Sequence, residues 1–162
     1  MAINFQTKND IYEIIKTKKR INIIGPPGSG KTNLCKDISK NTQINLIELD
    51  AILFDVNCNV LKNKSEVLLK AIESNSPCIV DGTYFSLMSQ ERIELIDQFI
   101  MIKVNFLRAF FGILKRTYKS KACTCGEKLN FSLIKFLFSY YFYKGNRLQK
   151  IIPNKKLIIC KI

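Results

Sequence analysis

The chain has 162 residues, and its 26 Lys and Arg against 13 Asp and Glu give a formal net charge of +13. This length suits one domain with a sizeable core, and the charge favours polyanionic partners such as nucleotides or nucleic acids, although a compositional bias toward Lys explains it equally well. The complete absence of histidine excludes His-based acid–base catalysis, Ser-His-Asp and Cys-His nucleophiles and His-ligated metals, so any catalytic base would be a carboxylate.

The N-terminal region predicts a helix. Asn9 or Asp10 would cap it, Ile11, Ile14 and Ile15 would form its apolar face, and it would end near residue 19. We expect residues 1–20 to be an addition that packs outside the core fold. The region lacks the apolar stretch of a signal peptide, and no run of the chain is long enough to span a bilayer, which predicts a cytoplasmic protein without a membrane partner.

A glycine-rich segment follows a short apolar strand at 21–24 and precedes a helix at 31–40. It fits the phosphate-binding pattern G-x-x-x-x-G-K-[ST], with Gly25, Pro26, Pro27, Gly28, Ser29, Gly30, Lys31 and Thr32. In such a loop the backbone N–H groups surround phosphate oxygens, the lysine reaches the β- and γ-phosphates and the hydroxyl binds Mg²⁺. Strand, loop and helix occur in the required order, so we interpret residues 25–32 as a P-loop that binds ATP with Mg²⁺.

The remaining elements alternate between strands and helices. The expected strands are 44–49, 78–82, 99–102 and 156–160. The expected helices are one carrying Val67, Leu68 and Ile72, one from a Ser89 cap to Ile96, one over 106–119 and an aromatic one over 131–143. Gly145 and Asn146 are expected to interrupt the aromatic helix. This alternation predicts an α/β P-loop NTPase fold with a five-stranded parallel sheet and helices on both faces. A lid is expected over about 115–147.

Two carboxylates should meet the P-loop at the carboxyl edge of the sheet. Asp81 closes an apolar strand and would hold Mg²⁺, and Asp50 would orient or deprotonate an acceptor hydroxyl. Glu48 and Asp55 are weaker alternatives to Asp50. A turn aspartate before Gly82 and a helix-capping aspartate at position 50 are the corresponding structural interpretations.

Several cations could serve the transferred phosphoryl group. Arg116 is favoured because a guanidinium binds phosphate oxygens in bidentate fashion, and the further lid or substrate candidates are Arg92, Lys115, Lys119 and Arg147. Cations at the end of a helix can equally complement its dipole. The pair Cys123 and Cys125 is two ligands short of a closed zinc site, and the six cysteines are expected to be free thiols.

The class of P-loop protein follows from what the chain lacks. No N-K-x-D base-reading motif of a GTPase is present, and a motor or AAA-type ATPase is expected to need a longer chain. A small phosphotransferase with a basic lid remains. The alternative is a nucleic-acid-associated P-loop ATPase, indicated by the charge and by the Tyr, Phe and Lys residues of 131–147.

The chain resembles the topology-modulation protein family, a branch of the adenylate-kinase-related P-loop kinases, over about residues 20–160. The resemblance rests on the P-loop, Leu49 and Asp50, the segment Asp81, Gly82, Thr83 and Tyr84, Arg92, the segment Leu114 to Arg116, the aromatic helix with Lys135 and Tyr140, and Arg147. It implies a kinase-type fold using ATP and Mg²⁺, with a family name tied to DNA topology and no settled acceptor.

The chain departs from the family pattern at three positions. An acidic residue and a proline are usual near the end of the fourth strand, where this chain has Lys103 and Asn105. The arginine expected within the following helix is replaced by Gly112, and Arg108 lies one turn earlier. The identity of the lid arginine is therefore open at this point.

Overall fold

The computed structural model describes residues 3–5, 8–53, 63–119 and 131–161. Its strands are β1 (Ile3–Phe5), β2 (Arg20–Ile24), β3 (Asn45–Glu48), β4 (Cys78–Asp81), β5 (Gln98–Lys103) and β6 (Leu157–Lys161). They form one six-stranded sheet in the order β1-β6-β5-β2-β4-β3, and every neighbouring pair is parallel. The five predicted strands are all present, and β1 extends the sheet at its β6 edge. The parallel α/β fold is confirmed.

Eight α-helices are described along the chain: α1 (Lys8–Thr17), α2 (Lys31–Thr42), α3 (Leu49–Leu53), α4 (Lys64–Ser74), α5 (Gln90–Leu95), α6 (Phe106–Lys119), α7 (Phe131–Ser139) and α8 (Gly145–Ile151). Short helical turns are η1 (Phe85–Leu87) and η3 (Asn154–Lys156), and η2 (Tyr140–Lys144) is π-helical. The α6 helix has the predicted bounds, and Ser89 caps α5 by accepting a hydrogen bond from the Arg92 N–H at 3.3 Å. No helix of the described residues is long and apolar enough to cross a bilayer.

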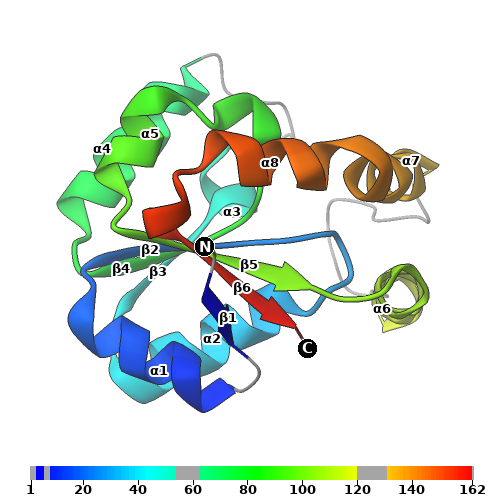
Figure 1. The fold of residues 1–162 in the computed structure, drawn as a ribbon, viewed down its shortest axis with the longest axis horizontal. Helices are drawn as coiled ribbons and strands as arrows, with labels where there is room; N and C mark the ends of the chain where they lie inside the picture. Colours follow the sequence, from blue (N-terminus) through cyan, green and yellow to red (C-terminus); the bar gives the residue numbers. More distant parts are fainter. Residues whose placement is uncertain (1–2, 6–7, 54–62, 120–130, 162) are drawn as a thin grey trace.

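Alternating side chains of the strands build a core on each face of the sheet, as the two-residue period of a strand requires. One core joins Val80 of β4 and Phe99 of β5 to α3, α4, α5 and α8. The other joins Ile79 and Ile100 of the same strands to α1, α2, α6 and α7. Figure 1 shows the sheet between the α4, α5 and α8 layer and the α1 and α2 layer.

Two expectations about helices were wrong. The N-terminal helix α1 does not lie outside the core, because Ile11 and Ile15 are buried in the α2-side core. Gly145 does not interrupt the aromatic helix, because its φ of −61° and ψ of −45° are helical, and the chain stays helical from α7 through η2 into α8. A π-helical segment absorbs the register change, so no break is needed.

Candidate functional site

The glycine-rich loop of residues 25–30 joins β2 to α2 at the carboxyl edge of the sheet. Gly28 and Gly30 have φ values of +75° and +86°, a region that residues with side chains rarely adopt, so both positions favour glycine. The loop begins at Gly25, whose N–H donates to the Thr83 hydroxyl at 3.1 Å while that hydroxyl donates to the Gly25 carbonyl at 2.8 Å. Sequence reasoning assigned Thr83 no separate role.

Lys31 lies over the loop at the first position of α2. Its ammonium group donates to the Pro26 carbonyl at 2.7 Å and to the Ser29 hydroxyl at 3.4 Å. These partners hold the cation inside the concave loop, where phosphate oxygens are expected. In the predicted role of Lys31, a phosphate would replace these loop oxygens as the acceptor.

Asp81 is the last residue of β4 and is only 8% exposed. The Thr32 hydroxyl lies close enough to lower the pKa of this carboxyl, Asp81 in turn raises the pKa of the nearby Cys35 thiol, and the Asp81 Oδ1 atom has no hydrogen-bond partner among the described residues. Burial raises the pKa of Asp81, and the charges of Asp50 and Glu48 add to this, against the opposing effects of Thr32 and Lys31. A buried carboxylate with an unused oxygen is poised to accept a cation.

The donor set at this point suits magnesium. The Asp81 carboxylate and the Thr32 hydroxyl are hard oxygen ligands, which Mg²⁺ prefers. Among the described residues no group of three or more His, Cys, Asp or Glu could hold a metal. Protein oxygens would therefore supply only part of a coordination shell, as is usual for Mg²⁺ sites completed by water and nucleotide phosphates.

Asp50 lies in the first turn of α3, directly after β3, and is exposed. It accepts a hydrogen bond of 2.7 Å from the Tyr84 hydroxyl, and burial together with this carboxylate raises the pKa of Tyr84. Glu48, by contrast, forms an ion pair with Lys36 at 2.9 Å. Asp50 is thus held by a neutral hydroxyl and Glu48 by a cation, which favours Asp50 as the carboxylate for an acceptor. The third candidate, Asp55, lies outside the described residues.

Helix α6 packs directly on the P-loop, beside which Figure 1 places it. A Cβ atom built at Gly112 would lie 2.1 Å from the Gly28 carbonyl oxygen, and one built at Gly28 would lie 2.1 Å from the Ala109 carbonyl oxygen. No side chain fits between the two backbones. The contact leaves room only for glycine at position 112.

The candidate cations have different surroundings. Lys115 is exposed on α6, and Arg116 and Lys119 belong to the last turns of that helix, where the placement of their side chains lies outside what the structure describes. Arg147 is exposed on α8, with its guanidinium 5.1 Å from the Phe85 ring centre. Because Phe85 follows Tyr84, Arg147 lies on the Asp50 side of the site.

Arg92 has a different environment from the one expected of a substrate-binding cation. It is 0% exposed, and its guanidinium donates to the Asn22 side-chain oxygen at 2.7 Å and to the Leu87 carbonyl at 3.4 Å. A side chain enclosed in the core on the α5 face cannot touch a ligand without rearrangement. We therefore do not assign Arg92 to the lid.

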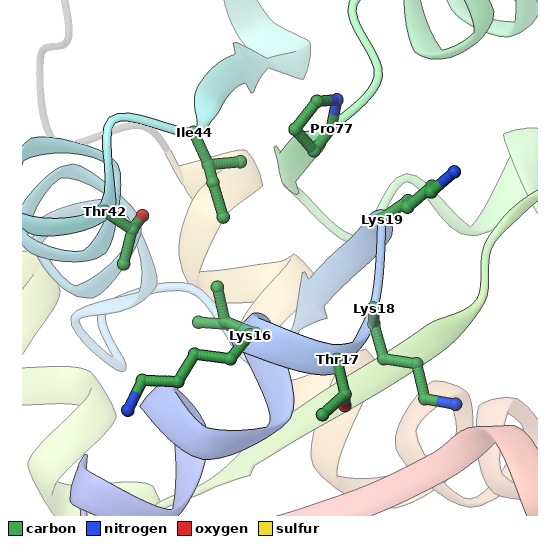
Figure 2. A pocket seen from close by; sticks show the side chains of 8 residues that line it. Lys16, Thr17, Lys18, Lys19, Thr42, Ile44 and Pro77 are labelled. Carbon is green, nitrogen blue, oxygen red and sulfur yellow. The ribbon is translucent and has the colours of Figure 1, made fainter.

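A hollow of about 410 Å³ lies at the opposite edge of the sheet, where Lys19, Ile44 and Pro77 precede β2, β3 and β4. Figure 2 shows its lysine side chains pointing away from one another, and Lys16 is paired with Glu13 at 2.7 Å. Cations that diverge do not form a convergent anion site. This hollow therefore lacks the convergent cations of an anion site.

Comparison with known proteins supports a P-loop domain. A family model described as ATPase family associated with various cellular activities (AAA) matches residues 21–81, from β2 through Asp81. An uncharacterized protein of Staphylococcus saprophyticus is 28% identical over 128 residues, which cover 75% of this chain and 46% of that protein. The chain thus spans less than half the length of this relative, so its length is no argument against an AAA-type ATPase.

Solved structures show the fold. Shikimate kinase from Acinetobacter baumannii in complex with shikimate aligns with a TM-score of 0.58 at 14% identity, covering 93% of this chain and 86% of that one. A gluconokinase from Sinorhizobium meliloti 1021 aligns with a TM-score of 0.50 at 13% identity, covering 88% and 82%. At these identities the likeness concerns the fold alone. The chain has a P-loop NTPase fold similar to that of shikimate kinase.

Proposed function

We propose that this protein is a cytoplasmic, ATP-dependent phosphotransferase that uses Mg²⁺ and acts on a small-molecule or nucleotide acceptor. One observation carries the proposal: the Oδ1 atom of buried Asp81 has no hydrogen-bond partner among the described residues, and it belongs to a carboxyl whose pKa is lowered by the Thr32 hydroxyl and by the charge of Lys31. A carboxylate, a hydroxyl and an ammonium group at the end of a P-loop are the components of phosphoryl transfer.

The residues divide the work by position. The loop amides and Lys31 would hold the triphosphate, and Thr32 and Asp81 would hold Mg²⁺, which when bound neutralises charge on the phosphate oxygens. Asp50, fixed by the Tyr84 hydroxyl at 2.7 Å, would orient the acceptor hydroxyl. The acceptor oxygen would bond to the γ-phosphorus while the bond to the β-phosphate oxygen breaks, and its proton would pass to Asp50.

Cations beyond the loop would complete the site. Arg116 is proposed to neutralise charge on the transferring group, with Lys115 and Lys119 on the same helix as lid residues, and Arg147 is proposed to face the acceptor. Support comes from the solved kinases with this fold, one of which holds shikimate. Such neighbours favour a small acceptor.

The test is ATP consumption against a panel of nucleosides, nucleotides, sugars and oligonucleotides, with Lys31→Ala as the inactive control. Lys40→Ala, in the last turn of the same helix, is the matched control for removing a lysine. We expect an acceptor-dependent rate that Lys31→Ala abolishes and Lys40→Ala leaves intact. Equal rates for Lys31→Ala and the unmodified protein would refute the assignment.

The second candidate function is a nucleic-acid-associated ATPase, and the distribution of charge favours it. Residues 104–162 contain 13 of the 26 Lys and Arg residues but one of the 13 acidic residues. The same region exposes five large apolar side chains, four of them aromatic: Leu107, Phe111, Phe138, Phe142 and Tyr143 are 46% to 78% exposed. Cations beside exposed rings are the usual platform for single strands.

This candidate is tested by binding of an oligo-dT strand at several salt concentrations. Phe111→Ser with Phe142→Ser should weaken binding at least tenfold, since stacking on each ring contributes about 1–3 kcal/mol. Val67→Ser, which removes an exposed apolar side chain on α4, should not. Binding near physiological salt no stronger than that of an unrelated basic protein would exclude this function.

A further inference from the structure

Arg92 is a buried cation to which the described residues offer no anionic partner. Its Nε atom has no hydrogen-bond partner among the described residues, and no ion pair described in the structure includes it. Burial lowers the pKa of Arg92 to about 10, which still leaves it charged at neutral pH. Burying a charge costs free energy when no carboxylate compensates it. We therefore ask what the contacts of Arg92 do.

The main contact fixes the orientation of an amide. Arginine can only donate hydrogen bonds, so Asn22 must present its oxygen to Arg92, and their atoms lie 2.7 Å apart. The NH₂ group of Asn22 then necessarily faces the other way. There it donates to the Val80 carbonyl at 2.9 Å and the Gly82 carbonyl at 3.2 Å.

Val80 and Gly82 are the two neighbours of Asp81. Asn22 therefore holds the backbone on both sides of that residue, across the paired strands β2 and β4 in which Asn22 is the register partner of Val80. Gly82 is held further by its N–H, which donates to the Ile23 carbonyl at 3.3 Å. The next residue, Thr83, anchors the start of the P-loop at Gly25.

We infer that Arg92, acting through Asn22, is a positioning residue that sets the Asp81 carboxylate for magnesium. The inference rests on the proposed function only for the identity of the bound cation. The clamp, by which we mean the hydrogen bonds from Arg92 to Asn22 and from Asn22 to Val80 and Gly82, consists of protein contacts alone. Mg²⁺ accepts little deviation from octahedral geometry, so a ligand must be held by surroundings that do not shift. The Arg92–Asn22 pair supplies that rigidity by holding the end of β4 through Val80 and Gly82.

The test uses Asn22→Asp and Arg92→Met. Asn22→Asp gives Arg92 a carboxylate partner, so the fold should be retained, but it replaces the donor that faces Val80 and Gly82 with an acceptor. Arg92→Met removes the charge and frees the amide to rotate. Arg20→Met is the matched control, because Arg20 begins the same strand and donates to the Leu95 carbonyl at 3.3 Å, away from Asp81.

Two readouts separate positioning from stability. The first is NMR of the free protein, in which the Gly82 and Gly25 amide resonances should shift and Gly82 should exchange faster with solvent in both variants but not in Arg20→Met. The second is binding of a fluorescent ATP analogue, for which the Mg²⁺ concentration giving half-saturation should rise at least tenfold while metal-free binding changes less than twofold. Melting temperatures confirm folding.

Unchanged Gly82 and Gly25 resonances in folded Asn22→Asp and Arg92→Met would overturn the inference, as would a metal dependence equal to that of Arg20→Met. If the unmodified protein binds no nucleotide, the proposed function fails instead, and the NMR measurement still decides whether the clamp exists.

Discussion

The contact between α6 and the P-loop predicts that replacing Gly112 with alanine destabilises the protein, whereas helix propensity alone predicts that it stabilises the protein. Gly112→Ala adds one methyl group in a helix interior, where alanine is ordinarily favoured over glycine by about 1 kcal/mol. The added Cβ would lie 2.1 Å from the oxygen, 2.9 Å from the carbon and 3.0 Å from the Cα of Gly28. All three atoms are backbone atoms, so the clash cannot be relieved by rotating a side chain.

The magnitude follows from this geometry. Relieving the contact requires the helix and loop to separate by about 1 Å in a closely packed region. Overpacking of this kind costs about 1–3 kcal/mol, and a backbone clash belongs at the upper end. After the helix-propensity gain, Gly112→Ala should lower the free energy of unfolding by about 2 kcal/mol and the melting temperature by about 4–8 °C.

Urea unfolding followed by circular dichroism measures this change, because the chain has no tryptophan to report by fluorescence. Phe111→Ala is the control, since Phe111 neighbours Gly112 in the same helix and is 62% exposed. Affinity for a fluorescent ATP analogue should also fall in Gly112→Ala, because the displaced atom belongs to the P-loop. A variant as stable as the unmodified protein, with undiminished affinity, would show that α6 does not pack on the loop as described.

Three further predictions concern charge, thiols and capping. Because burial raises the pKa of Asp81, the folded protein holds that proton more tightly than the unfolded chain, and the stability this contributes at low pH is lost as the pH rises through the folded pKa. Asp81→Asn should therefore raise the free energy of unfolding by about 0.5–2 kcal/mol at pH 7 and by less at pH 4. The same variant should lose Mg²⁺-dependent turnover. A lower free energy of unfolding at pH 7 would contradict this reasoning. Cys35, Cys78 and Cys160 are buried, and burial raises the pKa of Cys78 to about 11. Mass spectrometry should therefore find all three thiols unlabelled by iodoacetamide at pH 8 until denaturant is added. Rapid labelling without denaturant would contradict the described burial. Ser89→Ala should cost about 1 kcal/mol in urea unfolding through loss of the α5 cap, and no loss would mean that this hydrogen bond contributes nothing.

The sequence carried most of the fold. The apolar runs before the P-loop and before Asp81 predicted β2 and β4, and the pattern of 106–119 gave the bounds of α6. These signals are local, because strand and helix periods repeat within a few residues. The edge strand β1 has only three residues, too short for any period to appear.

The P-loop was also predicted directly, because every fixed position of the motif is occupied by the residue type that the motif specifies. Asp81 and Asp50 followed from topology, since parallel strands end at one edge. Sequence could not show that Tyr84 holds Asp50 or that Thr83 ties Gly25. The first contact joins residues 34 positions apart in the sequence, and the second joins residues 58 positions apart.

Only the tertiary structure shows what surrounds Arg92 and Gly112. An arginine three residues after a helix cap is ordinarily exposed, and only the packing of α5 against β2 encloses Arg92 beside Asn22. A glycine inside a helix signals a close approach without naming the neighbour, which proves to be Gly28. The sequence by itself determined where the P-loop lies, because the motif depends on residue type and spacing along the chain. Which side chains hold the site rigid depends on contacts across the sheet, and those exist only once the chain has folded.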